Sequence, residues 1–253
     1  MNFDLNGKVA LVTGGNGGIG LGMARGLAQA GAAIAIAARN RAKADAALDD
    51  LRAHGGKAAF IHLDVLDEAS CRSAITKTVA EFGRLDVLIN NSGTTVRKPP
   101  EALTAAEWRL VIETNLTGAF LCSQAAHPEM VRAGGGKIIN IGSMMSLFGA
   151  PYAAPYAASK GGIVQMTRAL ATAWAKDNIQ VNAVLPGWID TELTRRAREQ
   201  VAGLNERVLA RTPAGRWGVP DDLAGVAAFL GSAAADFVTG AAIPVDGGYA
   251  SEF

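Results

Sequence analysis

The residues best suited to chemistry are a tyrosine and a lysine four positions apart, Tyr156 and Lys160. From there to about Ala175, apolar residues recur at three- and four-residue steps, which predicts a helix with one apolar stripe. Residues four apart share a face of a helix, so the phenol should lie beside the ammonium. The positive charge would lower the tyrosine pKa from about 10 and allow proton exchange near neutral pH. Alone, this spacing also fits a surface lysine beside a packed ring.

A glycine-rich turn follows the first apolar run. Residues 9–12 read Val-Ala-Leu-Val, which is typical of a strand buried on both faces of a parallel sheet. Residues 13–20 read Thr-Gly-Gly-Asn-Gly-Gly-Ile-Gly, and a helical stripe begins at Met23. This order predicts a phosphate-binding loop, because glycines let the backbone approach a pyrophosphate and a helix N-terminus offers free N–H groups. A flexible turn is the structural alternative.

The second predicted strand, residues 34–38, ends at Arg39 and Asn40 without a carboxylate. In a dinucleotide-binding unit, an acid at this point accepts the ribose 2′-hydroxyl of NAD, whereas a base accommodates the 2′-phosphate of NADP. The sequence therefore favours NADP(H). NAD(H) stays possible, since Arg39 could also stack on adenine. Asp64, at the end of the third strand, could accept the adenine amino group or serve as a helix N-cap or turn acid.

Strands alternate with helices along the rest of the chain. Further strands are predicted at 59–64, 85–89, 137–141, 179–184 and 242–245, and helices at 42–54, 69–82, 108–115, 118–131, 156–175 and 221–230. This order predicts an α/β fold, a Rossmann-like, right-handed doubly wound parallel sheet with helices on both faces. The whole chain, 1–253, is expected to form one domain. The polar, arginine-rich residues at about 190–212 have a weak helical pattern and are expected to form a mobile segment over the site.

Several polar residues interrupt these elements. Asn115 places an amide in mid-helix, where it needs a partner, and Pro128 is expected to end or kink its helix. Asn91 and Ser143 follow two predicted strands. Ligands of open α/β sheets bind beyond the carboxyl ends of the strands. We therefore expect both residues near the glycine turn and the tyrosine.

Composition limits the possible partners of this 253-residue chain. Its formal net charge is +1, which gives no field to recruit nucleic acid or an anionic membrane. Two cysteines, Cys71 and Cys122, cannot build a disulfide framework, which favours a reducing compartment. The N-terminus lacks a signal-peptide pattern and no apolar run approaches membrane-spanning length, so a cytoplasmic location is expected. His54, His62 and His127 are scattered, and no metal site is predicted.

The ordered motifs resemble the short-chain dehydrogenase/reductase family along essentially the whole chain. They are Thr13-Gly-x-x-x-Gly18-x-Gly20, Asp64, Asn90-Asn91-Ser92-Gly93, Asn115, Ser143, Tyr156-x-x-x-Lys160 and Pro186-Gly187-x-x-x-Thr191. Ser92 departs from the alanine that the family usually has. Within the family, residues 26–31, 135–141 and 213–218 are similar to dehydrogenases that act on gluconate or 2-deoxy-D-gluconate.

The resemblance implies roles for these residues. Tyr156 would be the general acid/base, Lys160 would lower its pKa and bind the nicotinamide ribose, Ser143 would hold the substrate oxygen, and Asn115 would anchor a water in a proton relay. A homotetramer is also implied. The cofactor contacts implied are Gly14, Asn16, Gly17, Gly18, Ile19, Gly20, Arg39, Asn40, Asp64, Val65, Asn91, Ser92, Gly93, Tyr156, Lys160, Pro186, Gly187, Ile189 and Thr191.

The expected function is interconversion of a secondary alcohol and a ketone on a small polar molecule, such as a sugar or sugar acid. One alternative is reduction of a 3-oxoacyl thioester, which would call for a basic patch at the site mouth. Arg97, Lys98, Arg195 and Arg196 leave that alternative open. The other alternative is a non-catalytic NADP-binding sensor, against which the intact set of chemical residues argues.

Overall fold

A parallel sheet of seven strands forms the centre of the computed structural model, which describes residues 3–53 and 56–252. The strand order is β3-β2-β1-β4-β5-β6-β7, and every neighbouring pair is parallel. All seven predicted strands are confirmed. Their bounds are β1 Val9–Thr13, β2 Ala33–Ala38, β3 Ala58–His62, β4 Val87–Asn90, β5 Gly136–Ile141, β6 Ile179–Pro186 and β7 Ala242–Val245.

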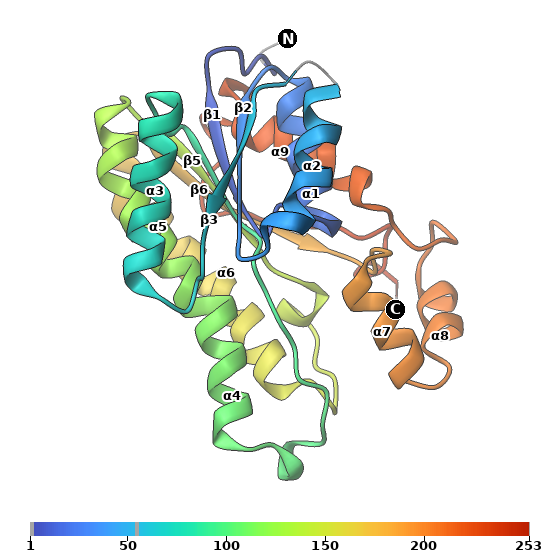
Figure 1. The fold of residues 1–253 in the computed structure, drawn as a ribbon. Coiled ribbons are helices and arrows are strands. Elements are labelled where there is room, and N and C mark those ends of the chain that lie inside the picture. The colour runs from blue at the N-terminus through green and yellow to red at the C-terminus, as the bar shows by residue number, and fades with distance from the viewer. Residues whose placement is uncertain (1–2, 54–55, 253) are drawn as a thin grey trace.

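Helices cover both faces of the sheet (Figure 1). Successive side chains of a strand point to opposite faces, and β1 illustrates the result. Val12 joins the apolar cluster under one set of helices, whereas its neighbour Leu11 joins the cluster under the other set. The first set is α1 (Gly18–Gln29), α2 (Arg41–Ala53) and α9 (Ala224–Gly231); the second is α3 (Glu68–Phe82), α5 (Gly118–Arg132) and α6 (Ala154–Trp174). The doubly wound sandwich is therefore confirmed.

The strand order reverses between β1 and β4. From β1 the chain builds outwards to β2 and β3, and then returns to the other side of β1 with β4 and β5. Loops leaving β1 and β4 consequently part in opposite directions and open a crevice at their carboxyl ends. This is the edge to which the sequence assigned the chemical residues.

The interruption at Asn115 is a π-helical turn, Glu113–Thr117, between α4 (Ala105–Ile112) and α5. Pro128 does not end α5, which continues to Arg132, so that part of the expectation was wrong. Pro128 and Gln124, whose carbonyl loses its helical donor, are both exposed, so water can satisfy that carbonyl. The predicted end of the second helix, at His54, lies outside the described residues.

Residues 190–212 contain more helix than their weak pattern predicted. They form α7 (Glu192–Gln200) and α8 (Leu204–Arg211). Ala197, Leu204 and Val208 are buried in a small apolar cluster of their own, against which Trp188 and Trp217 pack. The two indoles meet edge to face, with ring centroids 5.6 Å apart. Aromatic residues outside the segment therefore complete a core that the polar composition of the segment obscures.

No helix within residues 3–53 and 56–252 combines the length and apolar character needed to cross a bilayer.

Candidate functional site

A cavity of about 810 Å³ opens at the carboxyl ends of the strands, where their order reverses. The structure brings nearly all the predicted site residues to its walls. They are Gly14, Asn16, Gly17, Gly18, Ile19, Arg39, Asn40, Asp64, Val65, Asn91, Ser92, Gly93, Ser143, Tyr156, Lys160, Pro186, Gly187, Ile189 and Thr191. Gly20 and Asn115 are the two predicted residues that do not line the cavity. Each lies behind a wall and supports it.

Residues at the end of β4 hold the glycine turn in place through hydrogen bonds. Asn91 donates through Nδ2 to the carbonyls of Thr13 (3.0 Å) and Gly14 (3.1 Å). The Thr13 hydroxyl accepts from the backbone N–H groups of Asn91 and Ser92, both at 2.9 Å. A Cβ on Gly20 would lie 2.5 Å from Asn91 Nδ2, so only glycine permits this approach. Serine in place of the family's usual alanine at position 92 leaves this contact intact, because residue 92 contributes its backbone N–H and not its side chain.

Cationic and amide groups gather at the end of β2. Arg39 is exposed, and no ion pair joins it to a carboxylate in the described part of the chain. The Asn40 side-chain oxygen accepts from the Lys43 N–H (3.0 Å) at the start of α2. Asp64 is a turn acid, because its carboxylate accepts from the Leu66 N–H (3.1 Å). The N-cap of α3 is Asp67 instead.

Tyr156 and Lys160 lie in the first two turns of α6 and face the cavity together, as predicted. Lys160 Nζ lies 5.6 Å from the centroid of the Tyr156 ring and donates to the carbonyl of Ile141 (2.6 Å). Ser143, which lies two residues beyond the end of β5, is the side-chain hydrogen-bond partner of the Tyr156 hydroxyl. Ser146 fixes this loop to α6 by donating to the carbonyl of Lys160 (2.7 Å). The ends of β5 and α6 therefore set the geometry of the three groups.

Burial dominates the protonation of this pair. It raises the pKa of Tyr156 above its usual value, while the hydrogen bond from Ser143 and the charge of Arg97 act in the opposite direction. Burial also lowers the pKa of Lys160 to about 8. The expectation that the charge of Lys160 lowers the tyrosine pKa is therefore wrong, because burial outweighs the charges near the phenol. The Lys160 ammonium is directed to the Ile141 carbonyl, and the apolar surroundings disfavour both charged forms.

Asn115 is buried, with 1% of its surface exposed. Its Nδ2 donates to the Thr94 carbonyl and to the Ser159 hydroxyl, both at 3.0 Å. Its Oδ1 accepts from the Thr94 N–H (2.8 Å). The π-turn aims this amide inward and ties the loop after β4 to α6, so the amide has the partners that a mid-helix position requires. Its expected part in a water relay stays a prediction.

Arg97 is a cavity residue that sequence reasoning did not select as a site residue. It donates to the side-chain oxygen of Gln200 (3.2 Å) and to the Leu193 carbonyl (3.5 Å), both on α7. Burial lowers its pKa, while Tyr156 and Tyr152 act in the opposite direction. No carboxylate in the described part of the chain forms an ion pair with it. The sequence offered Arg97 only as one base of the thioester alternative, and the tertiary fold places it beside Tyr156, because no motif marks its position.

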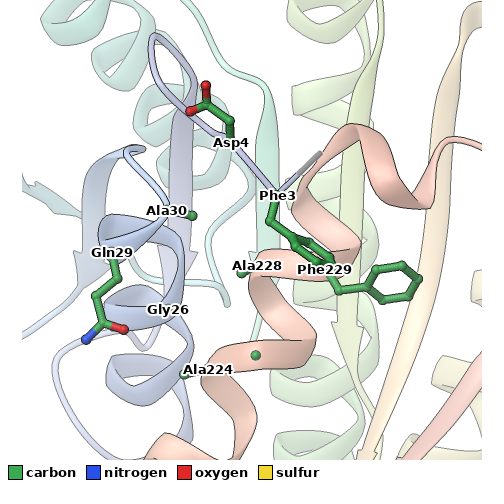
Figure 2. Close-up of a pocket in the computed structure, with 9 residues that line it drawn as sticks. Phe3, Asp4, Gly26, Gln29, Ala30, Ala224, Ala228 and Phe229 are labelled. Atoms are coloured by element: carbon green, nitrogen blue, oxygen red, sulfur yellow. The ribbon is translucent and has the colours of Figure 1, made fainter. Parts of the chain in front are cut away.

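A second cavity, of about 650 Å³, lies between the end of α1 and α9 (Figure 2). The Phe3 and Phe229 rings meet there edge to face, with centroids 6.2 Å apart. Asp4 is the one charged group among its described lining residues, and its carboxylate already accepts from Asn6. This cavity lies near the amino ends of the strands, and no residue of the sequence motifs is among its described lining residues.

The first cavity fits a dinucleotide. Gly14 (φ +63°) and Gly18 (φ +53°) adopt left-handed conformations that leave the backbone of the turn open to a ligand. Lys160 uses one of its three N–H donors on Ile141, which leaves two for a ligand. Among the described residues, no cluster of His, Cys, Asp and Glu could hold a metal ion.

Comparisons with known proteins agree with this geometry. A family model described as enoyl-(acyl carrier protein) reductase matches residues 14–250. A 2-dehydro-3-deoxy-D-gluconate 5-dehydrogenase of Formosa agariphila is 42% identical over 247 residues, which cover 97% of this chain and 94% of that protein. A gluconate 5-dehydrogenase of Gluconobacter oxydans is 39% identical over 248 residues, with 97% and 96% covered.

Among solved structures, a gluconate 5-dehydrogenase from Burkholderia cenocepacia in complex with NADP and tartrate is 44% identical and gives a TM-score of 0.94. The match covers 100% of this chain and 98% of that one. With the family model matching nearly from end to end, the chain belongs to the short-chain dehydrogenase/reductase family.

Proposed function

We propose that the chain is an NADP(H)-dependent oxidoreductase that interconverts a secondary alcohol and a ketone on a sugar acid. The observation that carries the substrate class is Arg97. It is a half-buried cation without a carboxylate partner in the described chain, and it lies close enough to Tyr156 for its charge to favour the phenolate form. A substrate carboxylate is the partner that this guanidinium lacks, because arginine binds carboxylates through charge-assisted, often bidentate hydrogen bonds.

The residues of the cavity divide the chemistry among them. The nicotinamide, when bound, supplies or accepts the hydride. Tyr156 gives its phenolic proton to the ketone oxygen as the alcohol forms, and takes a proton in the reverse direction. Ser143, already hydrogen-bonded to Tyr156, orients the same oxygen. Lys160 stabilises the phenolate and binds the nicotinamide ribose, and Asn115 belongs to the proton relay.

Preference for NADP(H) follows from the adenosine end of the cavity. Arg39 offers a cation for the 2′-phosphate, and no acid in that position competes for the ribose hydroxyl. The Burkholderia relative, which is solved with NADP, supports the same assignment. NAD(H) stays the second cofactor.

The names of the relatives support a sugar acid as substrate. The Formosa and Gluconobacter proteins are named for oxidation at position 5 of 2-dehydro-3-deoxy-D-gluconate and of gluconate. We extend that substrate class to this chain through Arg97. Residues 190–212 would cover the bound substrate, and a cytoplasmic homotetramer is the proposed assembly.

The thioester alternative needs an uncompensated basic surface at the mouth of the cavity. Three of its four candidate bases are paired with carboxylates: Lys98 with Glu107, Arg195 with Asp190 and Arg196 with Glu192. Arg97, the fourth, is half-buried beside Tyr156. This distribution favours a small anion over an acidic carrier protein. A sensor role would leave the aligned Tyr156, Lys160 and Ser143 without use.

The test compares an acidic with a neutral substrate. We expect Arg97→Met to raise the KM for gluconate by about ten- to a hundredfold, the value of a hydrogen bond to a charged group. The KM for a neutral polyol should be unchanged, because a polyol has no carboxylate for Arg97 to bind. Arg195→Met removes an exposed arginine from α7 and is the matched control. Equal losses on both substrates would contradict the role of Arg97 in choosing acids.

A further inference from the structure

Two charged side chains meet across the adenosine half of the cavity. Lys43, in the first turn of α2, and Glu192, the first residue of α7, form an ion pair with 2.8 Å between Nζ and Oε2. Both residues line the cavity, although 149 positions separate them in the sequence. The pair therefore joins the adenosine site to residues 190–212.

The ion pair lies over the glycine turn. Lys43 Cε is 3.6 Å from the point where a Cβ on Gly17 would lie. The neighbouring Thr191 places its methyl group 3.3 Å from the equivalent point on Gly18. The beginning of α7 is thus joined to α2 by one polar contact and packs on the turn through one apolar contact. Only the polar contact can be exchanged for an anion.

The charges around Lys43 suit a phosphate. Arg39 and Asn40 line the cavity within four positions of Lys43, and the start of α2 adds the favourable end of a helix dipole. Glu192 has a second partner, Arg196, at 2.6 Å. The hydrogen bond and charge of Lys43, followed by the charge of Arg196, lower the pKa of Glu192 and keep it ionised. Glu192 would therefore keep a cation if Lys43 left.

We propose that Lys43 is a second cation for the 2′-phosphate of NADP(H), and that it leaves Glu192 when this phosphate binds. The inference rests on the proposed function, since it assumes that the cavity takes a dinucleotide. NAD(H) lacks the 2′-phosphate, so it leaves the Lys43–Glu192 pair in place. The ion pair that joins residues 190–212 to α2 is therefore present with NAD(H) and absent with NADP(H).

The exchange is feasible because the existing pair is weak. The Lys43 and Glu192 side chains are 51% and 60% exposed, and ion pairs at such positions contribute little. A phosphate carries more charge than a carboxylate and accepts several hydrogen bonds at once. Glu192 is then a competitor that weakens NADP(H) binding without affecting NAD(H) binding.

The experiment measures the dissociation constants of NADPH and NADH for the full chain by calorimetric titration at low salt. Lys43→Met should weaken NADPH binding about tenfold, the loss of one charge-assisted hydrogen bond, and leave NADH binding unchanged. Glu192→Gln should tighten NADPH binding about two- to fivefold, again without an effect on NADH. In the double variant, Glu192→Gln should have no further effect.

Glu206→Gln is the matched control, because it removes an exposed carboxylate from α8 and leaves Lys43 untouched. It should change neither constant. If Lys43→Met leaves NADPH binding unchanged, or if Glu192→Gln alters NADH binding equally, the exchange is overturned while the cofactor site stands. If the unmodified chain binds neither nucleotide, the proposed function itself fails, and the inference with it.

Discussion

At the scale of single residues, burial controls the reactive groups. Lys160 is 4% exposed, and burial lowers its pKa to about 8, within the range where enzymes work. Tyr156 stays protonated over that range, because burial raises its pKa. The phenol is therefore ready to donate a proton, while the ammonium is close to losing one.

This order of pKa values predicts the pH dependence of ketone reduction. Below pH 8, Lys160 is charged and can hold the developing phenolate, whereas above it the charge is lost. The kcat/KM for reduction, which reports on the free enzyme, should fall as pH rises through about 8. The residual rate of Lys160→Met should not show this fall. A wild-type profile that stays flat to about pH 10 would contradict it.

The sequence predicted the residues with intrinsic chemistry better than those whose role depends on their surroundings. Tyr156 and Lys160 could be placed on one face from their spacing alone. Arg97 could not be selected, because its meaning comes from Tyr152, Tyr156 and α7, which lie far from it in the sequence. The pKa of Tyr156 was misjudged for the same reason, since spacing carries no information on burial.

At the scale of elements, close contact of backbones places α1 and therefore the glycine turn that begins it. A Cβ on Gly26 would lie 2.2 Å from the Ala224 carbonyl oxygen at the start of α9. A Cβ on Gly22 would lie 2.1 Å from the carbonyl oxygen of Pro220, in the turn before α9. Glycines on α1 thus let α9 and the turn before it approach within backbone contact.

Gly26→Ala should therefore lower the free energy of unfolding by about 1–3 kcal/mol, the usual cost of overpacking, despite the better helix propensity of alanine. Gly225→Ala on α9 is the matched control, because no atom lies within 4 Å of its Cβ position. It should leave stability unchanged or raise it by up to about 1 kcal/mol. Urea unfolding of the two variants measures both values, and equal stabilities would refute the contact.

Elements with apolar cores of their own were predictable, and those completed by distant residues were not. The strands could be found because each contains a run of apolar residues, and those at the centre of the sheet, such as β1 and β2, are buried on both faces. The helices α7 and α8 gave a weak pattern, because Trp188 and Trp217 supply part of their core from outside. The prediction that Pro128 ends its helix was wrong for a third reason. Pro128 lies on the solvent side of α5, where water can satisfy the carbonyl that loses its donor.

At the scale of the whole molecule, the reversal of strand order brings distant residues to one cavity. The glycine turn after β1, Asn91 after β4, Ser143 after β5 and Pro186 at the end of β6 meet there. The alternation of strands and helices predicted a doubly wound parallel sheet, but the order of the strands could not be read from the chain itself. The site is consequently a property of the topology as much as of its residues.

Turnover and cofactor binding, measured together in Tyr156→Phe, test the role of Tyr156 as acid and base. The unmodified chain should oxidise gluconate with NADP⁺ and reduce the corresponding keto acid with NADPH. The variant loses only the proton donor, so kcat/KM should fall by about 10²–10⁴-fold or more while NADPH affinity stays the same. A variant that retains most of its activity with unchanged NADPH affinity would contradict the assignment of Tyr156 as the acid and base.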